Sequence, residues 1–182
     1  MINVLALVVG ALGWTITEYW LHRGWGHRGD AKNPFSVEHL AHHADVSYFA
    51  PTYKKVIVTA VVGTVLGSGL FLLFGQPGLD GALGFMVMYV TYEVIHRRLH
   101  THAGRGRYGR WARRHHLYHH YRRPKLNHGV TSPIWDFVFG TLEVPDIVKV
   151  PRRNALAWML DEEDELIPEL ADDFELIGRK RQ

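Results

Sequence analysis

The stretch that decides the fold spans residues 96–120 and reads HRRLHTHAGRGRYGRWARRHHLYHH. It begins with an HxxxH motif and ends with an HxxHH motif, and the five histidines of these motifs are His96, His100, His116, His119 and His120. On a helix, residues three or four positions apart lie on one face, so each motif is expected to point its imidazoles in one direction. Neutral imidazole is the commonest side-chain metal ligand, and five histidines at this spacing therefore predict a metal site.

Two more histidine motifs stand in the first quarter of the chain. They have the forms HxxxxH and HxxHH and contain His22, His27, His39, His42 and His43. Ten of the thirteen histidines thus fall in four motifs, and the other three are His102, His115 and His128. Ten imidazoles can supply about five ligands to each of two metals, so we expect the motifs to converge on one dinuclear site. Imidazole suits Zn, Cu, Fe and Ni, and the ligands alone do not select among them.

Four carboxylates are candidates to accept ring N–H groups and so to orient the imidazoles: Glu18, Asp45, Glu93 and Asp136. Each is equally explained as an ordinary helix-end residue. The chain has no cysteine, which excludes disulfides and thiolate metal ligands. It also has no recognisable flavin, haem or nicotinamide motif, so any redox reaction at the metals would need electrons from another protein.

Three apolar stretches lie around the histidine motifs, at residues 2–17, 56–74 and 82–95. The first two have no charged residue, and the third has one, Glu93. At about 1.5 Å per residue, sixteen residues span about 24 Å, slightly less than a hydrocarbon core of about 30 Å. A secretory signal is the competing interpretation of the first stretch, but a basic start and a small-residue cleavage site are missing. With its 182 residues, the chain is predicted to be an all-α integral membrane protein with three spans, or at most four.

The distribution of cations predicts the orientation. Residues 23–55 contain five, the Gly- and Pro-rich turn at residues 75–81 contains none, and the chain after His96 contains sixteen. Because cytoplasmic loops are enriched in Lys and Arg, both histidine-bearing segments are expected on the cytoplasmic face and the turn on the other. The four motifs would then form a cytoplasmic, helical cap that holds the dinuclear metal site.

The segment after the third apolar stretch is strongly basic, with eight cations in residues 105–125 and no acid in residues 94–135. Beside membrane helices, this pattern favours anionic headgroups or an acidic redox partner over nucleic acid, and an ordinary solvated surface is equally compatible. We expect no nucleic-acid partner, and we expect an electron carrier to dock on residues 105–123. Residues 161–175 contain nine acids, so residues 1–150 are expected to form the membrane domain and residues 151–182 a charged, peripheral tail without chemistry.

The order of the four motifs, preceded by Glu18 and Tyr19, resembles the fatty acid hydroxylase/sterol desaturase superfamily, and most closely its fatty acid 2-hydroxylases. The segments that carry the likeness are YEVIH (residues 92–96), HLYHHY (residues 116–121) and GVTSPIWDFVFGT (residues 129–141). The likeness covers residues 15–143. Thr101 stands where that pattern tends to have another histidine, and His128 where it often has an aromatic residue.

The resemblance implies a membrane-bound oxygenase in which the ten motif histidines hold two iron ions, with zinc as an alternative in the isolated protein. Such an enzyme would use O2 as co-substrate to hydroxylate a C–H bond of a fatty acid or lipid acyl chain. No catalytic residue beyond the metal ligands is expected. Eukaryotic members often carry a fused cytochrome-b-type domain, and none is recognisable here. A separate ferredoxin or cytochrome-b-type carrier is therefore the expected electron donor, with membrane lipids as the other partners.

Other functions remain open at this point. Within the superfamily they are carotenoid (β-carotene) hydroxylation and sterol desaturation, although the WDFVFGT sequence of residues 135–141 favours the 2-hydroxylase branch over the carotenoid one. Outside the enzymes, the alternative is a histidine-rich membrane metal transporter or, more weakly, a scaffold. A transporter is expected to place its ligands within the spans, near the membrane midplane, whereas these histidines fall beyond the apolar stretches.

Overall fold

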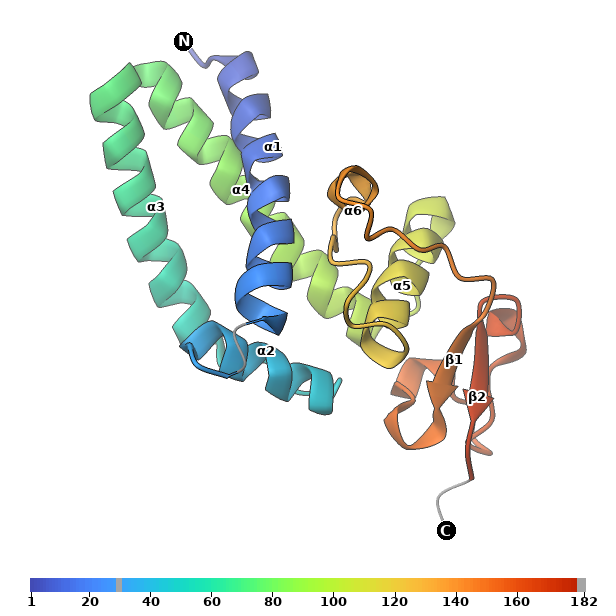
Figure 1. The fold of residues 1–182 in the computed structure, drawn as a ribbon. Coiled ribbons are helices and arrows are strands. Elements are labelled where there is room, and N and C mark those ends of the chain that lie inside the picture. The colour runs from blue at the N-terminus through green and yellow to red at the C-terminus, as the bar shows by residue number, and fades with distance from the viewer. Residues whose placement is uncertain (29–30, 180–182) are drawn as a thin grey trace.

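Three long helices dominate the computed structural model, which describes residues 1–28 and 31–179 (Figure 1). They are α1 (Val4–Trp20), which continues directly into the π-helix η1 (Leu21–His27), α3 (Thr52–Phe74) and α4 (Gln76–Thr101). Each of the three is long and apolar enough to cross a membrane. The three apolar stretches of the sequence therefore correspond to three helices of membrane-spanning length.

The connection between α3 and α4 is shorter than the composition of residues 75–81 indicated. Helix α4 begins at Gln76, because Pro77 lies in its first turn, where proline is tolerated. Gly75 alone reverses the chain, with a φ of +64° that favours glycine. The two helices are also very close at this end, since a Cβ atom on Gly78 would lie 2.0 Å from the carbonyl oxygen of Leu70.

Helix α1 crosses α4 through small residues. A Cβ atom on Gly10 would lie 1.8 Å from the carbonyl oxygen of Gly81, and one on Gly84 would lie 2.0 Å from that of Leu7. Glycines at a crossing allow two helix backbones to approach closely, which is a common way for membrane helices to associate. This crossing fixes α1, and with it His22 and His27 of η1, relative to the histidines of α4.

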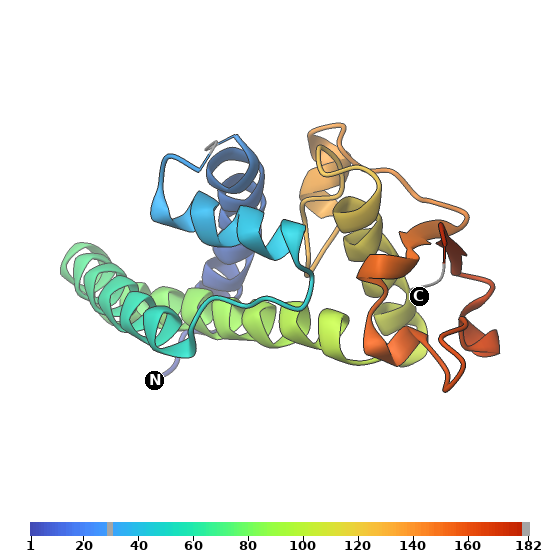
Figure 2. The same cartoon turned by 90° about the horizontal axis from the view of Figure 1, so that it is seen from below.

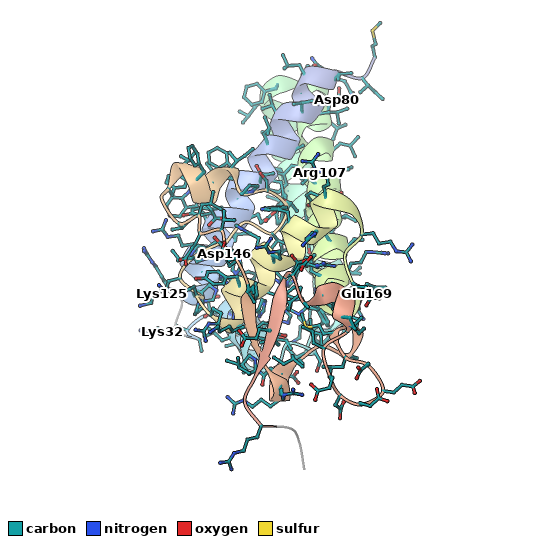
Figure 3. The ribbon with its side chains drawn as sticks, turned by 90° about the vertical axis from the view of Figure 1, so that its right-hand side faces the viewer. Lys32, Asp80, Arg107, Lys125, Asp146 and Glu169 are labelled. Atoms are coloured by element: carbon teal, nitrogen blue, oxygen red, sulfur yellow. The ribbon has the colours of Figure 1, made fainter. Side chains whose placement is uncertain are left out.

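The four histidine-bearing segments lie at one end of the long helices, opposite the α3–α4 turn (Figure 1). These segments are η1, α2 (Pro34–Ala44), the last turns of α4, and α5 (Gly106–Tyr121). Figure 2 looks onto this end, with α2 beside η1 and α5 next to the end of α4. Figure 3 shows Asp80 at the far end and Lys32 and Lys125 toward the histidine-bearing end. The four motifs thus share one end of the helices, as the distribution of cations predicted.

The fold is mostly helical rather than all-α, because two short parallel strands follow α6 (Ile134–Val138). Strand β1 (Val148–Pro151) pairs with β2 (Phe174–Ile177), and Val148 aligns with Phe174. Val148 and Val150 are buried and Lys149 is exposed, which is the alternation of a half-buried strand. These strands give no clear signal in the sequence, because each is only four residues long. The 3₁₀-helices η2 (Arg152–Asn154), η3 (Ala157–Met159) and η4 (Pro168–Leu170) lie between them.

The C-terminal segment packs on α5. Leu156, Met159, Leu170 and Phe174 form one apolar cluster with Leu117 of α5. These apolar residues are scattered among the acids that suggested a peripheral tail, so composition alone did not show them. The predicted boundary between residues 150 and 151 falls inside β1, and a division of the chain at that position stays a prediction.

Arg113 ties this segment to α5 through a buried ion pair. Arg113 Nη2 lies 2.6 Å from Asp173 Oδ2, and Arg110 Nε lies 2.9 Å from Asp173 Oδ1. Arg114 donates to the carbonyl oxygen of Asp146 at 2.7 Å. Arg113 and Arg114 thus bind acceptors of the chain itself. Docking of an electron carrier on residues 105–123 stays a prediction.

We expect Asp173→Ala to destabilise the packing of the C-terminal segment on α5, because it leaves the buried Arg113 guanidinium without its carboxylate partner. Removal of one member of a buried pair costs about 3–5 kcal/mol.

Burial alone raises the pKa of Asp173, but the hydrogen bonds from Arg113 and Arg110 outweigh it and hold the pKa below its ordinary value. The stabilisation is therefore present at neutral pH and is lost as the pH falls through this lowered pKa. Thermal unfolding of the purified protein between neutral and acidic pH measures both effects, with the exposed Glu169 as a matched control (Glu169→Ala). A melting temperature of Asp173→Ala equal to that of the control would contradict the expectation.

Candidate metal centre

The ten motif histidines come together in two groups of five. The first group consists of His22, His27, His39, His43 and His119. The second group consists of His42, His96, His100, His116 and His120. Within each group, one ring nitrogen of every histidine lies within 4.8 Å of the others. The prediction that four distant motifs converge on one place is confirmed.

The two groups lie side by side. The rings of His43 in the first group and His120 in the second are stacked, with centroids 4.0 Å apart. The sequence neighbours His42 and His43 belong to different groups, with ring centroids 6.4 Å apart. A pair of adjacent metal positions is therefore geometrically available.

Each HxxHH motif contributes to both groups, which differs from the expectation that a motif points in one direction. His39 and His43 are four residues apart and share the first group, whereas His42 belongs to the second. Likewise His116 and His120 share the second group, whereas His119 belongs to the first. Neighbouring residues on a helix differ by about 100° in direction, so the adjacent histidines of an HH pair face different centres.

The Nε2 atoms of the first group have the spacing of ligands around one cation. His27 Nε2 lies 2.9 Å from His119 Nε2 and 3.0 Å from His39 Nε2, and His119 Nε2 lies 3.2 Å from His43 Nε2. With metal–nitrogen bonds of about 2.0–2.1 Å, two ligand nitrogens lie about 2.9 Å apart at a right angle and about 3.3 Å apart at a tetrahedral angle. These distances fit metal ligation.

The second group has the same spacing. His42 Nε2 lies 3.1 Å from His96 Nε2 and 3.2 Å from His100 Nε2, and His100 Nε2 lies 2.8 Å from His116 Nε2. Both ring nitrogens of His120, the fifth member, are buried, and neither has a hydrogen-bond partner. A buried, unpaired polar nitrogen is costly, and a cation among the five rings would remove that cost.

Hydrogen bonds on the other side of the rings fix three of the imidazoles. Nδ1 of His22, His42 and His119 lies 2.5–2.6 Å from the backbone carbonyl oxygens of His128, Tyr48 and Leu126, respectively. When Nδ1–H donates to a carbonyl, the neutral ring presents a bare lone pair at Nε2. His119 Nε2 faces two other imidazole nitrogens with its single lone pair, and His22 Nε2 is buried without a partner. The donor set therefore fits a metal cation in each group.

Burial keeps the imidazoles neutral. In the segments outside the three long helices, burial and neighbouring histidines hold the pKa of His116, His119 and His120 well below its usual value. Burial, together with the charges of His27 and His42, lowers the pKa of His43 to about 2. These histidines are unprotonated at neutral pH, which is the form that binds metals.

A short loop after α5 supplies two of the orienting carbonyls. Leu126 and His128 flank Asn127, which is fully buried and has a φ of +57°. The Asn127 side chain donates to the carbonyl oxygen of Glu143 and accepts from its N–H group, both at 2.8 Å. Asp136 holds the loop further along, accepting from the N–H groups of His128 and Gly129 at 2.8 and 2.7 Å. Asn127 belongs to no recognisable motif, and its one signal in the sequence is that asparagine tolerates positive φ better than most residues.

The four carboxylates that were candidates to orient the imidazoles have other partners. Glu18 accepts hydrogen bonds from the backbone of Val130 and Thr131, and Glu93 lies 2.5 Å from Lys55 Nζ. Asp45 accepts from Ser47, and Asp136 holds the loop described above. Backbone carbonyls provide the orienting acceptors instead, and such acceptors leave no trace in a sequence.

The three histidines outside the motifs have different surroundings. His102 is exposed, whereas His115 is buried with Nε2 3.3 Å from Asp136 Oδ2. His128 is buried, and its ring lies edge-on to His22 and His119 at centroid distances of 5.4 and 5.3 Å. His128 therefore contacts the first group, although its ring nitrogens do not belong to it.

Three known proteins are each similar to about three quarters of this chain. The ceramide very long chain fatty acid hydroxylase scs7 of Schizosaccharomyces pombe is 31% identical over 157 residues, covering 77% of this chain and 43% of the relative. The dihydroceramide fatty acyl 2-hydroxylase FAH2 of Arabidopsis thaliana is 32% identical, covering 76% and 60%. The human fatty acid 2-hydroxylase is 29% identical, covering 74% and 38%. The chain thus spans only about two fifths to three fifths of the length of these relatives.

A solved structure of full-length scs7p, in which only the hydroxylase domain is visible, is similar with a TM-score of 0.61 and 32% sequence identity. The similarity covers 78% of this chain and 56% of that one. The family model described as fatty acid hydroxylase matches residues 7–141, which include all four histidine motifs. With the sequence match, the similar fold and the two histidine groups in agreement, the chain belongs to the fatty acid hydroxylase family.

Proposed function

We propose that this chain is a membrane-bound di-iron oxygenase that hydroxylates a C–H bond of a fatty acid or a lipid acyl chain, using O2 and external electrons. The observation that carries the proposal is the pair of adjacent groups of five imidazoles at one end of three membrane-length helices. The printed names of the relatives, which are hydroxylases of fatty acids and ceramides, supply the substrate class.

Each histidine group would hold one iron ion, and zinc could occupy the same ligands in the isolated protein. Iron at these positions would activate O2 with electrons delivered by a carrier. The ten ligands would be His22, His27, His39, His42, His43, His96, His100, His116, His119 and His120. No residue beyond these ligands acts as a catalytic acid or base.

The chain's own residues position the ligands and exclude water. Backbone carbonyls of residues 48, 126 and 128 fix the ring orientation of His42, His119 and His22. His116 and His119 are almost fully buried. Water is kept from the ligand nitrogens in this way, so that the reacting centre meets a bound acyl chain rather than solvent.

The position of the histidines also bears on the alternative of a metal transporter. His96 and His100 lie in the last two turns of α4, and the other ligands lie on η1, α2 and α5, at the same end of the long helices. A transporter site is expected at the membrane midplane. An enzyme that acts on a lipid at the membrane surface accounts for this placement better.

Mass spectrometry of the lipids of a heterologous host tests the proposal directly. Expression of the protein together with a compatible electron carrier should produce acyl chains that have gained one oxygen atom, and the purified protein should contain two metal ions per chain. A variant in which His116 and His119 are both alanine serves as the inactive control. Metal-loaded protein that leaves acyl chains, carotenoids and sterols unchanged would refute the oxygenase.

The histidine-bearing end is proposed to face the cytoplasm. Because the chain has no cysteine, single cysteines report its orientation without background. We expect a cysteine at Gln76 to react with an impermeant maleimide added to intact cells, and one at Arg107 to react only after lysis. Both positions are exposed. The reverse labelling pattern would overturn the orientation.

A separate ferredoxin or cytochrome-b-type protein is proposed as the electron donor. Arg122 and Lys125 are exposed and follow directly after the last histidines of α5, which makes this surface a better dock than the buried Arg113. An acidic carrier would be attracted to such a basic surface, mainly through faster association.

We expect the double variant Arg122→Glu/Lys125→Glu to slow carrier-dependent turnover at low salt. The difference should shrink at 1 M salt, where the Debye length falls to about 3 Å from about 10 Å at 0.1 M. Turnover is measured with a purified carrier, and metal content is measured in parallel. Lys149→Glu, on the exposed face of β1, is the matched control. Unchanged turnover, or a loss of metal with the loss of turnover, would contradict docking at this surface.

A further inference from the structure

Helix α6 lies beside the last turns of α1 rather than beyond its end (Figure 1). Trp135 Nε1 donates to Thr15 Oγ1 at 2.9 Å, and the ring of Phe139 stacks on that of Tyr19 at 5.1 Å. Helix α1 starts at the far end of the long helices, where the N–H group of Asn3 donates to Asp80. At about 1.5 Å per residue, Thr15 lies about 18 Å from Asn3, which is well inside a hydrocarbon core of about 30 Å.

The side chains of α6 are divided between an apolar outer side and a polar inner side. Phe137 is 76% exposed, Val138 56% and Ile134 53%, and all three are apolar. Asp136, on the inner side, is completely buried and accepts hydrogen bonds from the chain. No charged group of this helix is presented outward, so hydrocarbon can surround its outer side without the cost of desolvating a charge.

Most backbone N–H groups of this segment are paired within the chain, as a place without water requires. The N–H groups of residues 127–131, 134, 137 and 139–142 all donate to acceptors within the chain. Two of these acceptor groups are the buried carboxylates of Glu18 and Asp136. Irregular backbone is tolerated at membrane depth only where its polar groups are paired inside the protein.

We propose that residues 132–140 form a re-entrant segment in the hydrocarbon of the leaflet on the histidine-bearing side. The occupant of its outer surface is lipid: Ile134, Phe137 and Val138 contact acyl chains. The proposal rests on the position of α6 along a helix of membrane-spanning length, and it does not depend on the proposed enzymatic activity. It has a consequence for the metal centre, because the same segment continues back into the loop whose carbonyls orient His22 and His119.

Nitroxide labels on single cysteines test the depth of α6 in phosphatidylcholine vesicles. The sites are Phe137→Cys and Val138→Cys, so that one site reports if the other variant does not fold. Three reference sites on exposed residues calibrate the depth: Val65→Cys in the middle of α3, Tyr53→Cys in its first turn, and Glu162→Cys in the C-terminal segment. The measurement compares the collision rates of each label with O2, which concentrates in hydrocarbon, and with a water-soluble nickel chelate.

The labels at residues 137 and 138 are expected to collide more with O2 and less with nickel than the Tyr53 label, with a depth between those of Tyr53 and Val65. Three results would overturn the proposal. One is nickel accessibility equal to that of the Glu162 label, which would place α6 in water. Another is a depth at or outside that of Tyr53. The third is protection from both reagents, which would mean that protein, such as a second copy of the chain, covers α6 instead of lipid.

Discussion

We expect His119→Ala to lower hydroxylation by more than about 100-fold while the three long helices stay folded. His119 Nε2 lies close to both His27 and His43, so its removal takes a ligand from the centre of the first group. Changes to residues that merely orient a ligand already cost about 10–100-fold. The long helices are held by apolar burial and close glycine crossings, which do not involve the histidines.

Metal content separates this effect from general unfolding. Because His119 belongs to the first group and His120 to the second, His119→Ala should empty one metal position and leave the other filled. His120→Ala should empty the second position instead. Atomic absorption gives the number of metals per chain, and circular dichroism checks the helices.

Two other histidines of this region provide controls. His115 lies on the same helix and is equally buried, but it bonds Asp136 rather than a motif histidine, so His115→Ala should keep both metals. His102 is exposed, and His102→Ala should behave like the unchanged protein. If His119→Ala keeps two metals and normal turnover while His115→Ala loses them, the assignment of α5 ligands is wrong. If neither His119→Ala nor His115→Ala changes activity, the proposal that the protein is an oxygenase is refuted.

The second large effect is expected at Asn127, which no sequence motif marks. Asn127→Val places a β-branched side chain at a φ of +57°, a conformation that costs about 1–3 kcal/mol for such residues. The loop should shift to relieve this cost, and both carbonyls that orient His22 and His119 would move with it. We expect metal affinity of the first group to fall by about 10–100-fold, with the second group much less affected.

Asn127→Gly is the matched variant, because glycine adopts positive φ freely but lacks the hydrogen bonds to Glu143. Its affinity for the first metal should lie between those of the unchanged protein and Asn127→Val. Metal titrations of both variants, beside their melting temperatures, distinguish positioning from stability. Equal loss of both metals in Asn127→Val would assign the residue a purely structural role.

The apolar helices and the chemistry of the candidate ligands can both be predicted from the amino-acid sequence. A run of nineteen uncharged residues at positions 56–74 has few alternatives to a membrane-length helix, because each charged or unpaired polar group would be costly there. Ten histidines at helical spacing likewise predict candidate metal ligands, because the metal-binding property of imidazole and the helix period are both local features of the sequence. The likeness of residues 129–141 to one family then added the reaction class.

The grouping of the histidines and the atoms that orient them depend instead on how the helices and loops pack together. His42 of α2 meets His96 of α4, and His43 of α2 meets His119 of α5. These meetings are set by the packing of the helices rather than by any single motif. Backbone carbonyls exist at every residue, so nothing in the sequence distinguishes those of Leu126 and His128. The pairing of Arg113 with Asp173 joins residues sixty positions apart, and both the contact between the opposite charges and the burial of the two groups depend on a packed surface. Local sequence patterns determine where helices form and which side chains could bind a metal. Long-range contacts determine how these helices pack, because a residue becomes buried only when the chain has folded.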